Sequence, residues 1–282
     1  MGTYTTNLAL YKPAVGETGW GTLVNTNWDL LDAASLTTLL RGTLSGCQLS
    51  NNGGAPNTKI DISAGVAQDS ANAGTMTVSA IIKDISAVWA VGTNGGGRGT
   101  SVSLTANTWY HVFVIKRTDT GVVDAYFDTS ASAANIPSPY TWFRRVGSAK
   151  TDGSSNLIAF TQDGDDFMWQ TPVVDLSAGG SATAVSLTVT TPLGVRTKGL
   201  FQLTCSGGGV FAYVSDLTNV DLVPSATIAP LTNLNNATTT GVSGTMAVHT
   251  NTSSQIRYRN SSASGTFYLA TYGWVDTRGR FV

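Results

Sequence analysis

Apolar residues recur at helical spacing in one stretch near the start of the chain. Intervals of three and four residues continue through this stretch, and no other part of the sequence shows them as clearly. Such a period predicts a helix over Thr22–Leu40, with Thr22 as its N-cap and Gly42 as its stop. The positions that build its apolar faces, with one polar member, are Leu23, Asn27, Trp28, Leu30 and Leu31.

A helix with apolar residues on adjoining faces needs a surface to pack against. Two partners stay open on the residues alone: the sheets of the same chain, or copies of the helix around a symmetry axis. In the second arrangement the polar Asn27, at a core-type position, would help to set the register between helices.

After a polar connector at 42–58, the pattern changes to short apolar or alternating segments separated by turn residues. Thr108–Lys116 is apolar on both strand faces, which is typical of a central strand covered on both sides. The turn at 118–121 predicts a hairpin with Val122–Asp128. The glycine-rich segment 92–100 lacks the lysine and the helix of a phosphate loop, so we expect a surface loop.

A stretch rich in Gly and Ser, 172–180, predicts a linker, and alternation resumes at Val185. Together these patterns predict a mostly β fold: a short N-terminal arm and one helix, then two antiparallel β-sandwich or barrel-like domains. The expected units are residues 1–45 for the arm and helix, 46–172 for a central β-domain, and 173–282 for a C-terminal β-sandwich.

Composition narrows the function classes. Charged residues are 12% of the 282 residues and the net charge is -1, so nothing favours binding to nucleic acid or to an anionic membrane. No apolar run reaches the roughly 18–20 residues of a membrane span, and the start lacks a basic and then apolar leader. We therefore expect synthesis in the cytoplasm, without membrane insertion.

Few residues suggest catalysis. Asp163, Asp165 and Asp166 share one turn, and paired carboxylates can hydrolyse glycosides. No second acidic cluster faces them, and Glu17 is the sole glutamate, so a solvated turn is the favoured interpretation.

Metal sites are also poorly supported by the residue pattern. Asp152, Ser154, Asn156 and Asp163 match part of a calcium loop, but Leu157 stands where its glycine belongs. The two cysteines and two histidines are scattered (Cys47, Cys205, His111 and His249). We predict no catalytic residue, no metal and no cofactor.

Aromatic residues can hold sugar rings, although most aromatic residues in strands are core residues. The set we expect to face outward, and to contact a receptor, is Arg257, Tyr258, Arg259, Tyr272 and Trp274. Arg257 and Arg259 share one strand face, which would suit an anionic glycan or merely solvent.

Two stretches carry a resemblance. The string TTNLALYKPAVGETGWGTLVNTNWDLLDAA is similar to the N-terminal module of tailed-bacteriophage tail fibre and receptor-binding proteins. Segments 107–117 and 122–169 resemble a β-domain that recurs in phage tail appendages. Together they cover about a third of the chain.

The resemblance implies a homotrimeric structural virion protein that docks to the tail, baseplate or adaptor proteins through its N-terminus and contacts a bacterial surface glycan or protein through its β-domains. The docking and trimerisation residues implied are Pro13, Gly16, Trp20, Leu23, Asn27, Trp28, Leu30 and Leu31. Two alternatives stay open: a spike that degrades polysaccharide, and a head, collar or baseplate appendage without adhesive function. No repeat of 20–30 residues appears, which counts against the spike.

Overall fold

A computed structural model describes residues 3–4, 10–37, 42–207, 209–225, 227, 233–236 and 241–280 of the chain, without the side chains of 32–37 and 233–236. This part of the protein is mostly β, with several sheets and one α-helix, as the sequence predicts. No helix in it is both long enough and apolar enough to cross a membrane.

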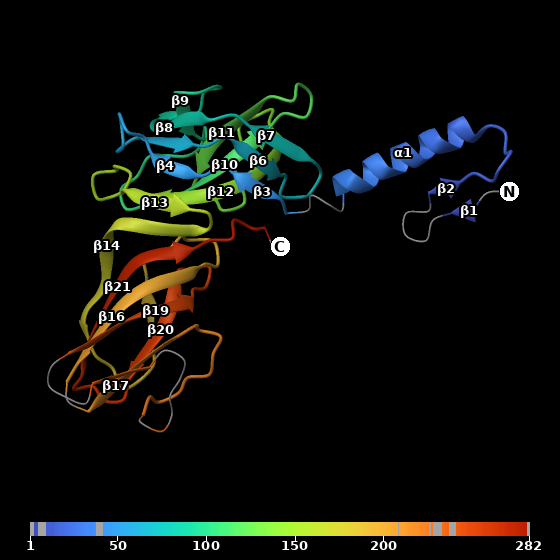
Figure 1. Ribbon diagram of the computed structural model, residues 1–282. Coiled ribbons are helices and arrows are strands. Elements are labelled where there is room, and N and C mark those ends of the chain that lie inside the picture. The colour runs from blue at the N-terminus through green and yellow to red at the C-terminus, as the bar shows by residue number, and fades with distance from the viewer. Residues whose placement is uncertain are drawn as a thin grey trace.

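The N-terminal segment forms a stalk that extends away from the β-structure (Figure 1). It consists of β1 (Thr3–Tyr4), β2 (Tyr11–Lys12) and α1 (Trp20–Thr37). The helix begins two residues before the predicted Thr22, a difference within the usual uncertainty of helix ends. Its predicted last turn, 38–40, lies outside the described residues. Packing of α1 against the sheets of this chain, one of the two open possibilities, is not what the structure shows.

The first β-body contains a mixed seven-stranded sheet that curves into a nearly closed barrel. Its strands, in spatial order, are β12 (Trp142–Lys150), β10 (Trp109–Lys116), β11 (Val123–Asp128), β9 (Gly95–Arg98), β8 (Ile81–Val88), β5 (Lys59–Ile62) and β4 (Leu49–Asn51). A small sheet beside it contains β3 (Leu44–Gly46), β6 (Gly65–Gln68) and β7 (Thr75–Val78).

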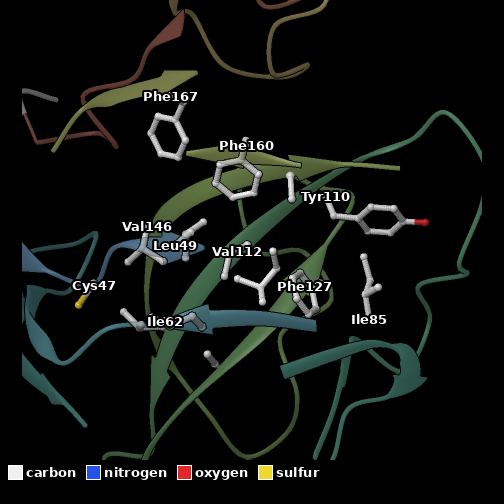
Figure 2. Packing of buried hydrophobic residues seen from close by; sticks show 14 of the residues in the cluster. Cys47, Leu49, Ile62, Ile85, Tyr110, Val112, Phe127, Val146, Phe160 and Phe167 are labelled. Carbon is white, nitrogen blue, oxygen red and sulfur yellow. The ribbon is translucent and has the colours of Figure 1, made fainter. Parts of the chain in front are cut away.

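The predicted central strand is confirmed as β10, which pairs with β11 and β12. Its β-branched and aromatic residues suit a pleated surface with neighbours on both faces. Tyr110, Val112 and Val114 belong to the main core, whereas Phe113 and Ile115 belong to a smaller cluster on the other face. Figure 2 shows side chains of the main core pointing toward one another from several strands.

The second β-body is an antiparallel sandwich of two sheets around its own core. One sheet has the order β13 (Phe160–Asp163), β14 (Asp166–Gly179), β21 (Thr266–Val275), β16 (Lys198–Ser206) and β19 (Val242–His249). The other has the order β15 (Val185–Thr188), β20 (Gln255–Asn260), β17 (Val210–Ser215) and β18 (Asn233–Asn236).

The predicted linker at 172–180 is wrong, because the chain there is part of β14. This strand pairs with β21 from Asp166 to Gly179, with register shifts along its length. Its second half is held by pairing with β21, by hydrogen bonds from Thr190 and Thr271 to Asp175, and by partial packing of Val173 and Leu176 against the cores. Polar, small and exposed residues separate these two apolar side chains, so no apolar alternation marks the strand in the sequence. The expected boundary at residue 173 therefore falls inside a strand.

The glycine-rich loop predicted at 92–100 is also wrong, because Gly95–Arg98 forms β9 between β8 and β11, parallel to both. A Cβ at Gly96 would lie 2.0 Å from the Val88 carbonyl oxygen, so only glycine permits this close approach. The strand is preceded by a turn whose carbonyls at Ala90 and Gly92 accept hydrogen bonds from Lys83 (2.7 and 2.9 Å).

Candidate functional site

In the stalk, the side chain of Asn27 makes the pair of hydrogen bonds to β2 that the backbone of a neighbouring strand would make. The Asn27 carboxamide accepts a hydrogen bond from the Tyr11 backbone N–H and donates one to the Tyr11 carbonyl, both at 2.6 Å. These two bonds tie α1 to β2 within one chain. Asn27 therefore has an intrachain role that the sequence pattern, which suggests a contact between helices, does not reveal.

Glu17 fixes the turn before the helix. Its carboxylate accepts hydrogen bonds from the Ala14 backbone N–H (2.8 Å) and from the Tyr11 hydroxyl. The Glu17 N–H in turn donates to the Ala14 carbonyl (3.1 Å). The sole glutamate of the chain is thus part of the stalk's local structure.

The stalk presents apolar side chains that no other described element covers. Trp20, Trp28 and Leu30 are 58%, 65% and 42% exposed, while Leu23 and Leu31 are half-buried. Among the described elements, α1 makes its main contact with β2. Such a surface on a projecting helix is unfavourable in water unless another chain covers it.

The turn between β2 and α1 is solvent-exposed. Pro13, Val15 and Gly16 are all exposed, and Gly16 has a φ of 81°, which favours glycine. The predicted docking residues Pro13, Gly16 and Trp20 therefore lie together at the end of the stalk that is remote from the β-bodies (Figure 1).

Two members of the predicted receptor-contact set do not face outward. Trp274 is fully buried and stacks on Phe167, with ring centroids 5.1 Å apart. Tyr258 is buried and stacks on Phe267 at 5.6 Å. A bulge in β21 at Tyr272 brings Trp274 to the face that the first β-body covers, whereas Tyr258 follows the inward alternation of β20. Tyr272 itself is half-buried.

The two arginines of that set hold a loop. Arg257 donates to the carbonyls of Asn219 (2.7 Å) and Leu217 (3.0 Å). Arg259 donates to the Ala182 carbonyl (2.9 Å) and pairs with Asp221 at 2.5 Å. Both guanidinium groups are therefore engaged within the chain, and they fix the first part of the segment that follows β17.

A hollow of about 610 Å³ lies beside this loop, between β17 and β19. Val220 and Leu222, which line it, are 76% and 39% exposed, and His249 is also exposed. The sequence pattern misses this surface because its apolar members lie on an irregular segment without a period.

The acidic turn between β13 and β14 is bound by the C-terminal tail. Asp163 and Asp166 are opposite each other in the backbone register of the β13–β14 hairpin. Asp165 accepts hydrogen bonds from Arg278 (3.1 Å) and Arg280, so its carboxylate is engaged in ion pairs. The tail therefore lies against this turn, with Arg278 buried.

The partial calcium loop is not assembled as a cation site. Asp152 Oδ1 accepts hydrogen bonds from the backbone N–H groups of Ser154 (2.8 Å) and Asn156 (2.9 Å), while Asp163 lies on β13. Within the described ranges, no group of three or more His, Cys, Asp and Glu side chains could hold a metal ion.

The sequence pattern also misses a buried group of charges between β12 and the tail. Arg145 makes a bidentate ion pair with Asp276 (2.6 and 2.7 Å), and both side chains are buried. Burial alone would raise the pKa of Asp276, but the Arg145 guanidinium outweighs it, so that pKa lies below its ordinary value. The adjacent arginines 144 and 145 within an apolar strand were the visible indication of this cluster.

His111 of β10 lies near this ion pair, on the strand face opposite the main core. Its Nδ1 is 2.9 Å from the Ser148 hydroxyl oxygen. Burial, together with the charge of Arg145, lowers the pKa of His111 to about 4. The imidazole is therefore neutral at pH 7.

Comparisons with known proteins assign no family: no family model and no curated protein matches this chain. The functional argument therefore depends on the residues and their geometry.

Proposed function

We propose that the protein is a homotrimeric tail fibre of a tailed bacteriophage, which docks to the virion through its N-terminal turn and contacts the host surface through its β-bodies. The observation that carries the proposal is the apolar surface of α1, with Trp28 and Leu30 exposed on a helix that projects from the β-structure. The resemblance of residues 5–34 to the N-terminal module of phage tail fibres points the same way.

Self-association explains the composition of the stalk. Three copies of α1 packed side by side would bury Leu23, Trp28, Leu30 and Leu31 without any contact to the sheets. Burial of each large apolar side chain contributes about 1.5–3 kcal/mol, so a few per chain can stabilise an assembly. The exposed turn at Pro13–Gly16 would then stay accessible to a docking partner.

Adhesion would gain from this arrangement because three tethered sites act together. Weak contacts to a repeated surface ligand add up when they are linked, even without a deep binding site in any one chain. The hollow beside Val220 and Leu222 on the second β-body supplies an accessible surface for such a contact.

The test compares the mass in solution of the full chain with that of a chain beginning at Gly42. We expect the full chain to have three times the 29.3 kDa mass of one subunit, and the truncated chain to be monomeric. Trp28→Gln combined with Leu30→Gln should have the same effect as truncation, while Asn25→Gln, at an exposed helix position, should not. A monomeric full chain, or a truncated trimer, would contradict the assembly role of α1.

Adhesion has its own measurement. The full protein should bind to host cells and should reduce adsorption of the phage when it is added first. Release of sugar fragments from purified surface polysaccharide would instead favour the depolymerase alternative.

A further inference from the structure

A pocket of about 280 Å³ lies where the C-terminal tail passes β12. Arg144 and Arg145 of β12 and Arg278 of the tail line it, together with Phe113, Phe143 and Ser70. Basic residues therefore line a pocket that is small enough for a single charged group.

Among the described residues, Arg144 is a buried cation with two nitrogen atoms that lack a hydrogen-bond acceptor. Its side chain belongs to a residue that is 3% exposed, and its Nε and Nη2 atoms have no partner among the described residues. Arg278 is 4% exposed, and although its Nη2 reaches Asp165, its Nε and Nη1 are likewise unpartnered within that part of the chain. A buried charged donor without an acceptor is strongly unfavourable, and native proteins rarely keep one.

The nearby carboxylates are already engaged. Both oxygens of Asp276 are bound by Arg145, and the oxygens of Asp165 are shared between Arg278 and Arg280. Asp69 is near enough for its negative charge to attract the Arg144 guanidinium, but its carboxylate already accepts hydrogen bonds from the backbone N–H groups of Ala71 (2.9 Å) and Phe143 (3.0 Å). The positive charge of Arg144 is therefore not balanced by an ion pair in the described structure.

We propose that this pocket binds a small oxyanion, the phosphate or carboxylate group of a ligand, through the guanidinium groups of Arg144 and Arg278. Planar guanidinium groups bind such anions through paired, charge-assisted hydrogen bonds. Phe113 and Phe143, whose ring centroids are 6.0 Å apart, form an apolar wall that lowers the local dielectric constant and strengthens the attraction. The inference does not depend on the proposed tail-fibre function.

Binding can be measured by thermal unfolding and calorimetric titration of the full chain. The probes are inorganic phosphate and glucuronate, with sodium chloride at equal ionic strength and glucose as the uncharged comparison. Either anion should raise the melting temperature with concentration, because a ligand that binds only the folded state stabilises it. The anion with the lower Kd shows whether the pocket prefers a phosphate or a carboxylate group. If neither anion changes the melting temperature, the proposal is overturned.

The variant Arg144→Gln should weaken binding of the effective anion at least tenfold. Its matched control is Arg117→Gln, which removes an exposed arginine that pairs with Asp119 outside the pocket. Equal Kd values for Arg144→Gln and the unaltered chain would overturn the assignment.

A second measurement separates loss of binding from loss of folding. Because no described residue forms an ion pair with Arg144, Arg144→Met should keep or raise the melting temperature in anion-free buffer, and the variant should no longer respond to the anion. A lower melting temperature in anion-free buffer would show that Arg144 already has a stabilising partner, and the proposal would fail.

Discussion

At the scale of residues, buried charges are the features that most need explanation. Lys83 and Asp124 form an ion pair at 2.8 Å with almost no exposure, and Arg145 and Asp276 form another. Removing one partner of such a pair leaves an uncompensated charge in an apolar environment. The resulting loss of folding free energy is far larger than for an exposed pair. These pairs connect segments that are distant in sequence, so they fix the fold rather than a local turn.

Asp276→Ala should therefore destabilise the protein by about 3–5 kcal/mol, because it leaves the Arg145 guanidinium buried and unpaired. The control is Asp119→Ala, which removes an exposed ion pair with Arg117. Chemical denaturation of both variants at pH 7 measures the difference, and a similar effect for the two would contradict the role of the buried pair.

Stability should fall as the pH is lowered from about 6.5 to about 4, because His111 has a lowered pKa in the folded state. Over this window the unfolded chain binds a proton at His111 and the folded chain does not, a difference worth roughly 3 kcal/mol at most. The charged groups that act on the ring are Arg145, Asp276 and Asp128.

Free energies of unfolding measured at pH 4.5 and 7 test this for the unaltered chain and for His111→Gln. The variant should show a smaller difference between the two pH values. His249→Gln, at an exposed position, is the control and should keep the full difference.

At the scale of elements, one local sequence pattern predicts its structure correctly and another does not. The hydrophobic period near the N-terminus correctly predicts α1, since helix formation depends on neighbours three and four residues apart. The glycine-rich segment that forms β9 gives no such indication, because its strand character comes from β8 and β11 on either side. Its glycines are required by the packing of other elements and not by a turn.

Gly96→Ala should destabilise the fold by about 1–3 kcal/mol, the range for overpacking a close contact. The added methyl group would lie 2.0 Å from the backbone oxygen of Val88, which cannot move without disturbing β8. Gly53→Ala is the control, since a Cβ there meets nothing within 4 Å. Equal melting temperatures for the two variants would contradict the packing argument.

At the scale of the whole molecule, the two β-bodies share strands instead of being joined by a linker. β14 and β21 run side by side from one body into the other. Phe267 and Leu269 of β21 belong to the core of the second body, whereas Trp274 of the same strand belongs to the core of the first. The C-terminal tail then pairs with Asp165 and closes the junction.

This continuity predicts that residues 42–282 unfold in a single cooperative transition. Scanning calorimetry should give equal calorimetric and van't Hoff enthalpies, because neither body can unfold without disrupting β14 and β21. Limited proteolysis should leave residues 172–180 uncut, whereas a flexible linker at this position would be cleaved early. Two separate transitions, or early cleavage in that segment, would contradict the shared-strand arrangement.

The sequence by itself determined the elements that depend on local spacing. Helical periodicity predicted α1, apolar residues on both faces predicted β10, and the turn at 118–121 predicted its hairpin with β11. These patterns reflect interactions between residues close in the chain or burial of a whole strand. The mostly β class followed from the same short segments and the abundance of turn residues.

Only the tertiary structure decided how these elements meet. Trp274 and Tyr258 are buried because distant strands cover them, and Arg144 lies beside the C-terminal tail across more than a hundred residues of chain. The segment at 172–180 is a strand because β21 supplies its hydrogen bonds. Contacts of this kind depend on partners far away in sequence, so no local pattern of residue types could specify them.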